Sequence, residues 1–134
     1  MRLALVQMSN SGNIEENLEK SIESIKDAAS NGAELVLFPE VQLTEFFPQY
    51  PGKDVRGYEI TIDSEIIKKF CGVCRENHIM AVPNIYLSED DRNYDASILI
   101  DTDGTVIGIQ KMVHVVQAKQ FYEQDYYTPS NDGF

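Results

Sequence analysis

The sequence predicts an α/β fold in which two helices cover one face of a mixed sheet. Short apolar runs typical of buried strands alternate with stretches of helical periodicity, in the order strand, helix, strand. Asp103-Gly104 lies between two further apolar runs, which is typical of a β-hairpin. A chain of 134 residues is long enough to bury its own core, so we expect residues 1–134 to form one domain.

The first strand–helix–strand unit ends at Pro39. Residues 3–8 form a short apolar run and predict a buried strand. Asn13 can cap a helix, and apolar residues then recur at helical spacing as far as Gly32, which favours a helix end. Residues 35–38 form the next apolar run. This order favours two parallel strands joined by a crossover helix.

The middle of the chain predicts a long loop and a second helix. Residues 41–58 contain two prolines and several aromatic residues, and a loop of that length is usually functional or a lid. A helix is expected from Asp63 or Ser64 to about Asn77. Three strands follow, at residues 79–82, where Pro83 ends the run, at 96–100 and, beyond the hairpin turn, at 106–109.

Composition and charge exclude some classes of partner. Hydrophobic residues make up 43% of the chain and charged residues 25%, while the formal net charge is −11. An acidic chain does not favour binding to nucleic acid or to an anionic membrane, but it is compatible with a cationic small substrate. The apolar runs are too short for a membrane span or a signal peptide, so we expect a cytoplasmic protein.

Three residues are candidates for chemistry. Glu40 directly follows an apolar strand, at the end where α/β sheets gather ligands, and partial burial would raise its pKa toward neutral. Lys111 ends a strand and could stabilise an oxyanion. Glu123 lies among aromatic residues and could orient Lys111 or a substrate. Taken singly, each is also explained as an ordinary surface residue.

Together these residues stand in an order that resembles the nitrilase superfamily, the carbon–nitrogen hydrolases. The segment 32–40, Gly-Ala-Glu-Leu-Val-Leu-Phe-Pro-Glu, is similar to the N-terminal motif of that family. Residues 5–7, the Asp103-Gly104 hairpin, Lys111 and the aromatic segment 121–129 follow in the same order. The resemblance covers the whole chain, and the aromatic segment looks most like the branch of N-carbamoylputrescine amidases.

The resemblance implies a site built from Glu, Lys and Cys, with a second Glu. Glu40 would be the general base and acid, Lys111 would stabilise the oxyanion, and Glu123 would position the reacting groups. The substrate would be a small molecule whose amide or ureido carbon–nitrogen bond is cleaved through a thioester. No metal or organic cofactor is implied. The fold would be half of an α-β-β-α sandwich.

Two local departures from the family pattern are visible. The family writes Lys, one residue, His, whereas His114 here follows Lys111 after Met112 and Val113. We interpret this spacing as a local insertion. Asp95 stands after the aromatic residue that opens the hairpin, where the family tends to place Asn.

The nucleophile is the larger departure. The family's cysteine follows a further strand beyond the aromatic segment, so we expect a truncated domain that is inactive alone and pairs with the missing C-terminal half or with itself. Cys71 and Cys74 share one apolar helix face, which predicts a core role, although their spacing also has the form of a redox motif. The alternative function is a non-catalytic fragment or pseudoenzyme that acts as a binding or interaction module.

Overall fold

A computed structural model describes residues 1–133 of the chain. Its helices are α1 (Ile14–Ser30) and α2 (Glu65–Asn77), with the short 3-10 helices η1 (Phe47–Gln49), η2 (Arg56–Tyr58) and η3 (Glu123–Asp125). Its strands are β1 (Leu3–Leu5), β2 (Leu35–Leu37), β3 (Met80–Val82), β4 (Asn84–Glu89), β5 (Arg92–Ile100), β6 (Val106–Lys111), β7 (Gln117–Ala118) and β8 (Phe121–Tyr122).

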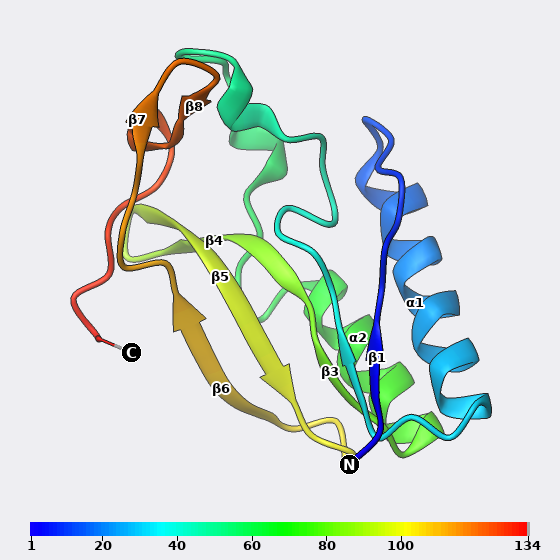
Figure 1. The fold of residues 1–134 in the computed structure, drawn as a ribbon. Helices are drawn as coiled ribbons and strands as arrows, with labels where there is room; N and C mark the ends of the chain where they lie inside the picture. Colours follow the sequence, from blue (N-terminus) through cyan, green and yellow to red (C-terminus); the bar gives the residue numbers. More distant parts are fainter. Residues whose placement is uncertain (134) are drawn as a thin grey trace.

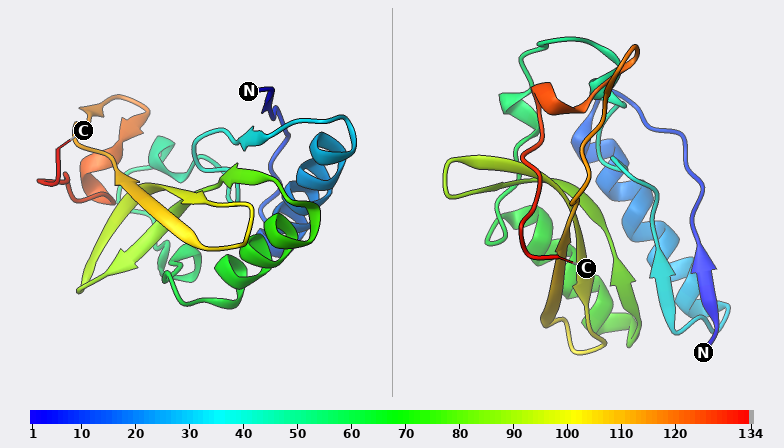
Figure 2. Two further views of the ribbon diagram at one scale, coloured as in Figure 1. Left: turned by 90° about the horizontal axis from the view of Figure 1, so that it is seen from below. Right: turned by 60° about the vertical axis from the view of Figure 1, so that its left-hand side comes forward.

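The main sheet is mixed. Strands β1, β2 and β3 are parallel neighbours, while β5 runs antiparallel to β3, β4 and β6. Both long helices lie on the same face of this sheet (Figure 1 and Figure 2). Strands β7 and β8 form a separate ribbon. The predicted fold class, a mixed sheet with helices on one face, is therefore confirmed.

Local sequence signals place the two helices where they were expected. The Asn13 side chain accepts hydrogen bonds from the backbone amides of Glu15 and Glu16 at the start of α1. Ser64 caps α2 by accepting a bond from the amide of Ile67. These side chains satisfy amides that have no partner within the helix.

Strand β4 was not predicted, because Pro83 was expected to end the third strand. Pro83 has no amide to donate, but its carbonyl accepts the amide of Ile98 at 2.9 Å, so β5 remains paired on both sides of the proline. The chain then turns at Asp90 and Asp91, with φ of 50° and 57°. Two successive residues at positive φ are typical of a tight hairpin turn, which connects β4 to β5.

The main core lies between the helices and the sheet. Phe70 of α2, Ile25 of α1 and Ile98 of β5 are all completely buried in it. Cys74 is also buried there, and burial raises the pKa of its thiol to about 12. The predicted core role is thus confirmed for Cys74, while Cys71 is partly buried against the same core.

A second hydrophobic cluster packs the loop that follows Glu40. Phe47 is completely buried, and its ring lies 5.0–5.8 Å from four tyrosine rings. We call these five residues the aromatic cluster: Phe47, Tyr58, Tyr86, Tyr126 and Tyr127. The loop is therefore anchored to β4 and to the segment that follows β8.

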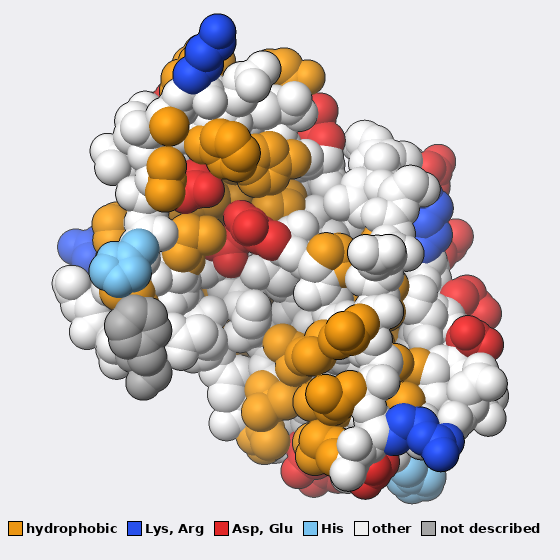
Figure 3. Space-filling model, in the orientation of Figure 1, with side chains coloured by type: hydrophobic (Ala, Val, Ile, Leu, Met, Phe, Trp, Pro, Cys, Tyr) orange, Lys and Arg blue, Asp and Glu red, His pale blue; other side chains and the backbone are white. Residues whose placement is uncertain are grey.

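The face of the sheet opposite the helices is uncovered in this chain. Leu3 and Leu5 of β1 point to that face and are 52% and 74% exposed. Figure 3 shows hydrophobic side chains gathered over β1, β2 and β3 on this side. We call this surface the open face. Within residues 1–133, no helix has the length and apolar character needed to cross a membrane.

Candidate active site

Glu40 lies just beyond the carboxyl end of β2, on a sharply turned backbone. The next residue, Val41, has a φ of 54°, which is a rare conformation for a β-branched side chain. Its amide donates to the side-chain oxygen of Asn84 at 2.8 Å, and its carbonyl accepts the Asn10 side chain at 2.9 Å. Neighbouring segments therefore hold the turn that presents Glu40.

Asn84 connects this turn to β5. Its side-chain nitrogen donates to Asp95 at 2.7 Å, while its backbone amide donates to the Gln42 side chain at 2.8 Å. Asn84, Asp95 and Gln42 are all buried. Because each buried polar group has a partner, the network fixes the positions of the Glu40 turn and Asp95 relative to each other.

Three carboxyl groups come together at this end of the sheet. The Glu40 and Asp95 side chains lie within hydrogen-bonding reach of each other, and the charge of Glu123 raises the pKa of both groups. Glu123 is 8% exposed and accepts the amide of Val116 at 2.8 Å. In Figure 3, acidic side chains lie beside hydrophobic ones in the upper half of the molecule.

The environment of Glu40 favours the neutral acid. Burial of its carboxyl group, followed by the charges of Asp95 and Glu123, raises the pKa of Glu40 to about 7. Glu40 as a whole residue is exposed to solvent. The negative charges of Asp95 and Glu123 therefore account for its raised pKa better than desolvation does. The pKa of Asp95 is also raised, mainly by burial. A carboxyl group with a pKa near 7 can both accept and donate a proton at neutral pH.

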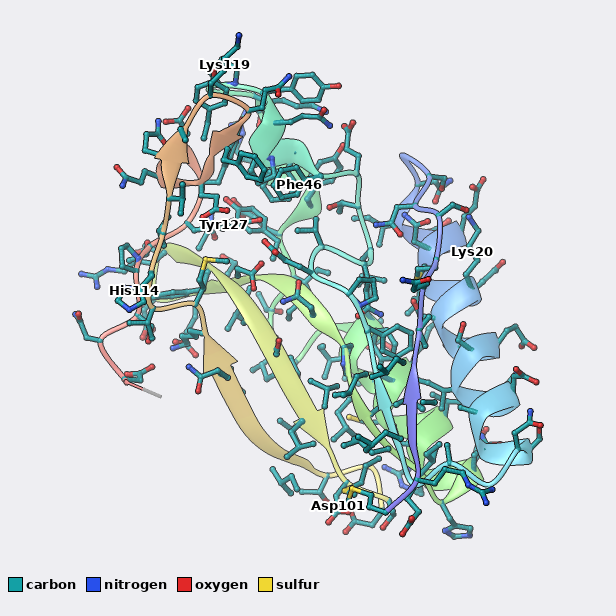
Figure 4. All side chains as sticks on the ribbon, in the orientation of Figure 1. Lys20, Phe46, Asp101, His114, Lys119 and Tyr127 are labelled. Atoms are coloured by element: carbon teal, nitrogen blue, oxygen red, sulfur yellow. The ribbon has the colours of Figure 1, made fainter. Side chains whose placement is uncertain are left out.

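Tyr127 closes the site on the side of the aromatic cluster. Burial raises the pKa of its hydroxyl, and the charges of Asp95, Glu40 and Glu123 raise it further. The phenol therefore stays protonated. Figure 4 shows Phe46 and Tyr127 in the upper half of the molecule, far from Asp101 in the β5–β6 turn.

The structure does not bring Lys111 to Glu40 and Glu123. The Lys111 ammonium pairs with Glu89, lies 3.7 Å from Asp132, and sits 4.7 Å from the centre of the Tyr94 ring. Among the described residues no ion pair joins Lys111 to Glu40 or Glu123, whereas the charge of Glu123 acts on Glu40.

Asp95 and Asn84 were not identified as site residues from the sequence. A signal was available for Asp95, since it is an acidic residue directly before the apolar run 96–100, and a charge there has to find a partner. Asn84 had no such signal, because its role depends on the turn at Val41 across the sheet. The cysteines are elsewhere: Cys71 and Cys74 lie in α2, on the helix-covered face.

These acidic side chains lie at the carboxyl end of a parallel strand, which is where α/β proteins gather their ligand sites. The sequence model described as "Carbon-nitrogen hydrolase" matches residues 2–134, and the chain belongs to that family. The resemblance to the nitrilase superfamily is thereby confirmed. Family members hydrolyse carbon–nitrogen bonds.

Two curated relatives and one solved structure illustrate the relationship. A citrullinase of Francisella tularensis is 28% identical over 135 residues, which cover 100% of this chain and 47% of the citrullinase. An N-carbamoylputrescine amidase of Oryza sativa is 24% identical, with 98% and 44% covered. A carbon-nitrogen hydrolase from Helicobacter pylori G27 superimposes with a TM-score of 0.90 at 17% identity, covering 98% of this chain and 46% of that one. The chain thus spans about half the length of these proteins.

Proposed function

We propose that this chain supplies the acid–base half of a carbon–nitrogen hydrolase site that acts on an amide or ureido group of a small molecule. The observation that carries the proposal is the Glu40 carboxyl group, which lies beside Asp95 just beyond the carboxyl end of β2 and whose pKa burial and acidic neighbours raise to about 7. Glu40 is the general base and acid, and Glu123 is a positioning residue. Asp95 keeps the pKa of Glu40 high.

The proposed reaction uses a thiol nucleophile. Glu40 accepts the thiol proton as sulfur bonds to the substrate carbonyl carbon, and it then gives that proton to the nitrogen as the carbon–nitrogen bond breaks. Glu40 next takes a proton from water, whose oxygen attacks the thioester. The carbon–sulfur bond breaks and Glu40 returns the proton to sulfur, so the enzyme is regenerated.

We propose a ureido compound as the substrate. Citrullinase and N-carbamoylputrescine amidase are both named for molecules with a carbamoyl group on nitrogen. The net charge of −11 and the grouping of Glu40, Asp95 and Glu123 favour a substrate with a cationic end.

The attacking thiol in this proposal is not one of the 134 residues. Cys74 is buried, with a thiol pKa of about 12, and burial also raises the pKa of the Cys71 thiol. A high thiol pKa leaves little thiolate at neutral pH. We therefore propose that residues 1–134 act as one domain, and that the nucleophile is supplied by a polypeptide covering the open face.

Ammonia release from citrulline and N-carbamoylputrescine tests this assignment. The purified chain is expected to release none above the protein-free rate. Release that is lost in Glu40→Gln, but kept when both cysteines are replaced by serine, would show that the chain has a different nucleophile. Release that persists in Glu40→Gln would remove the acid–base role of Glu40.

The position of Lys111 favours a second candidate, a non-catalytic binding module. With its ammonium held by Glu89, this lysine cannot stabilise an oxyanion beside Glu40. The binding module predicts saturable shifts of the Tyr127 and Glu123 NMR signals on addition of N-carbamoylputrescine, without turnover even when a thiol-bearing partner chain is present. Turnover with such a partner would reject it.

A further inference from the structure

We infer that position 112, the first residue after β6, and not position 111, directs its side chain toward the carboxyl groups, so that Met112 leaves the site without a cation from this segment. This inference deepens the proposed function, because it assigns the residue that sets the charge of the same site. It is carried by strand register and by the contacts of two neighbouring residues.

The pairing of β5 with β6 fixes which side chains share a face. Ala96 lies opposite Lys111 as the last pair of the two strands, and Asp95 and Met112 are the next residue of each chain segment. The Met112 amide donates to the Asp95 carbonyl at 2.9 Å, which continues the pairing to that residue. Residues directly opposite on antiparallel strands point to the same face, with Cβ atoms about 4.5–5.5 Å apart. Met112 is therefore the cross-strand neighbour of Asp95.

Lys111 points to the other face of the sheet. Side chains alternate along a strand, and the ring beneath the Lys111 ammonium belongs to Tyr94, the residue before Asp95. Glu89 lies two positions beyond Leu87, which packs in the helix-side core, so it shares that face and holds the ammonium. The Lys111 side chain is only 14% exposed, so its surroundings hold it on this face of the sheet.

The strand register also argues against the local insertion that the spacing between Lys111 and His114 suggested. The only irregularity in the β5–β6 pairing lies between Leu99 and Ile100, well before Lys111. Counting back from His114 with the expected spacing of Lys, one residue, His gives position 112. Methionine stands there, and the lysine one residue earlier faces away.

A lack of positive charge around Glu40 adds to the effect of burial on its pKa. Among the described residues, Asp95 from β5 and Glu123 from η3 act electrostatically on Glu40, the Tyr127 hydroxyl lies beside the same acids, and none of these three groups carries positive charge. Without an ammonium, two adjacent carboxyl groups retain a proton between them. A lysine at position 112 would lie across from Asp95 and would favour the ionised form of both acids.

Carboxyl-carbon NMR titration of two matched variants tests the inference. Met112→Lys is expected to lower the pKa of Glu40 by about one pH unit or more, since an opposite charge at about 4–6 Å has that effect. Lys111→Met is expected to leave the Glu40 pKa within about 0.3 of the wild-type value, because its ammonium is on the other face. Met112→Gln, which adds polarity without charge, is the control.

The opposite pattern, in which Lys111→Met raises the Glu40 pKa and Met112→Lys leaves it unchanged, would overturn the inference. If Met112→Lys does not fold, the charge is added after folding. Met112→Cys in a Cys71→Ser background is modified with aminoethyl methanethiosulfonate or, as the neutral match, methyl methanethiosulfonate. Only the charged adduct is expected to lower the Glu40 pKa, and equal values for both adducts would reject the inference.

Failure of the proposed function gives a different result from failure of this inference. A wild-type Glu40 pKa near its ordinary value would remove the acid–base role, whatever the variants do. The comparison of Met112→Lys with Lys111→Met would still show which position faces Glu40. Conversely, a wild-type value near 7 with no response to Met112→Lys would retain Glu40 and reject only position 112.

Discussion

At the scale of single residues, the proton shared by Glu40 and Asp95 is the most consequential feature. Glu40 is fixed by the turn at Val41, and Asp95 is fixed by Asn84. The two carboxyl groups are therefore held next to each other in both their neutral and their charged forms. Retaining one proton avoids two adjacent negative charges. Burial raises the pKa of both groups, and the negative charges of Asp95 and Glu123 raise that of Glu40 further.

The raised pKa of Glu40 has a consequence for stability. The folded carboxyl group titrates at about 7 and the ordinary value is 4.5, so the folded state binds more protons between those two pH values. Stability should then fall as pH rises through this window. In Glu40→Gln this part of the slope should be absent. Urea unfolding of both proteins from pH 4 to 8 measures the difference, and parallel curves would contradict it.

Replacing Asp95 should change the ionisation of Glu40. Asp95→Asn keeps an oxygen to accept from Asn84 but removes a neighbouring negative charge, so the pKa of Glu40 should fall. Asp101→Asn, at the far end of β5 (Figure 4), is the matched control and should have no effect. Carboxyl-carbon NMR follows both, and an unchanged Glu40 pKa in Asp95→Asn would show that burial alone raises it.

At the scale of elements, β4 joins the site to the sheet. Its first residue, Asn84, bonds to the turn after β2 through Val41 and Gln42, and to β5 through Asp95. The strand itself pairs with β5 along its whole length. A hairpin that the sequence pattern did not reveal therefore determines where the acids lie.

Removing the Asn84 side chain should be costly. Asn84→Ala leaves the buried Val41 amide without a partner and removes one hydrogen bond from Asp95, and an unsatisfied buried polar group costs about 1–3 kcal/mol. We expect a loss of about 2 kcal/mol or more in urea unfolding, together with a shift in the Glu40 NMR signal. Ser24→Ala is the control, since its hydroxyl donates to the Lys20 carbonyl in an exposed position on α1, and its cost should stay below about 1 kcal/mol. Equal losses in the free energy of unfolding for the two variants would show that the hydrogen bonds of Asn84 do not contribute more than an exposed hydrogen bond.

At the scale of the whole molecule, the open face is the surface that most needs a partner. Soluble monomers rarely expose large contiguous apolar patches. Leu3, Leu5 and their neighbours form such a surface on the side that carries Glu40. We therefore propose that a complementary half, or a second copy of the chain, covers it.

Sedimentation velocity tests the role of the open face. The wild-type chain is expected to associate as its concentration rises, and Leu5→Lys should shift it toward the monomer because a buried unpaired ammonium is unfavourable. Val116→Lys changes a residue that is also exposed, at 50%, but lies outside the main sheet, and it should leave association unchanged. A wild-type chain that stays monomeric throughout would contradict the proposal.

The sequence by itself determined the two long helices, most strands of the main sheet and the family. Helix α1 and helix α2 begin at the capping residues Asn13 and Ser64 because capping depends only on neighbours along the chain. The segment ending in Glu40 carried the family resemblance, and the residues around it are contiguous. Cys74 was assigned to the core from its place on an apolar helix face.

Tertiary structure alone decided which side chains meet. Contacts between β4, β5 and the turn after β2 bring Asp95 next to Glu40. No pattern of neighbouring residues in the sequence predicts that these two side chains are close in space. Lys111 and Met112 differ by one position, yet strand pairing sends them to opposite faces of the sheet. Because side chains alternate along a strand, a register error of one residue reverses the assignment of a site residue, and only the paired neighbour, here Ala96 or Asp95, resolves it.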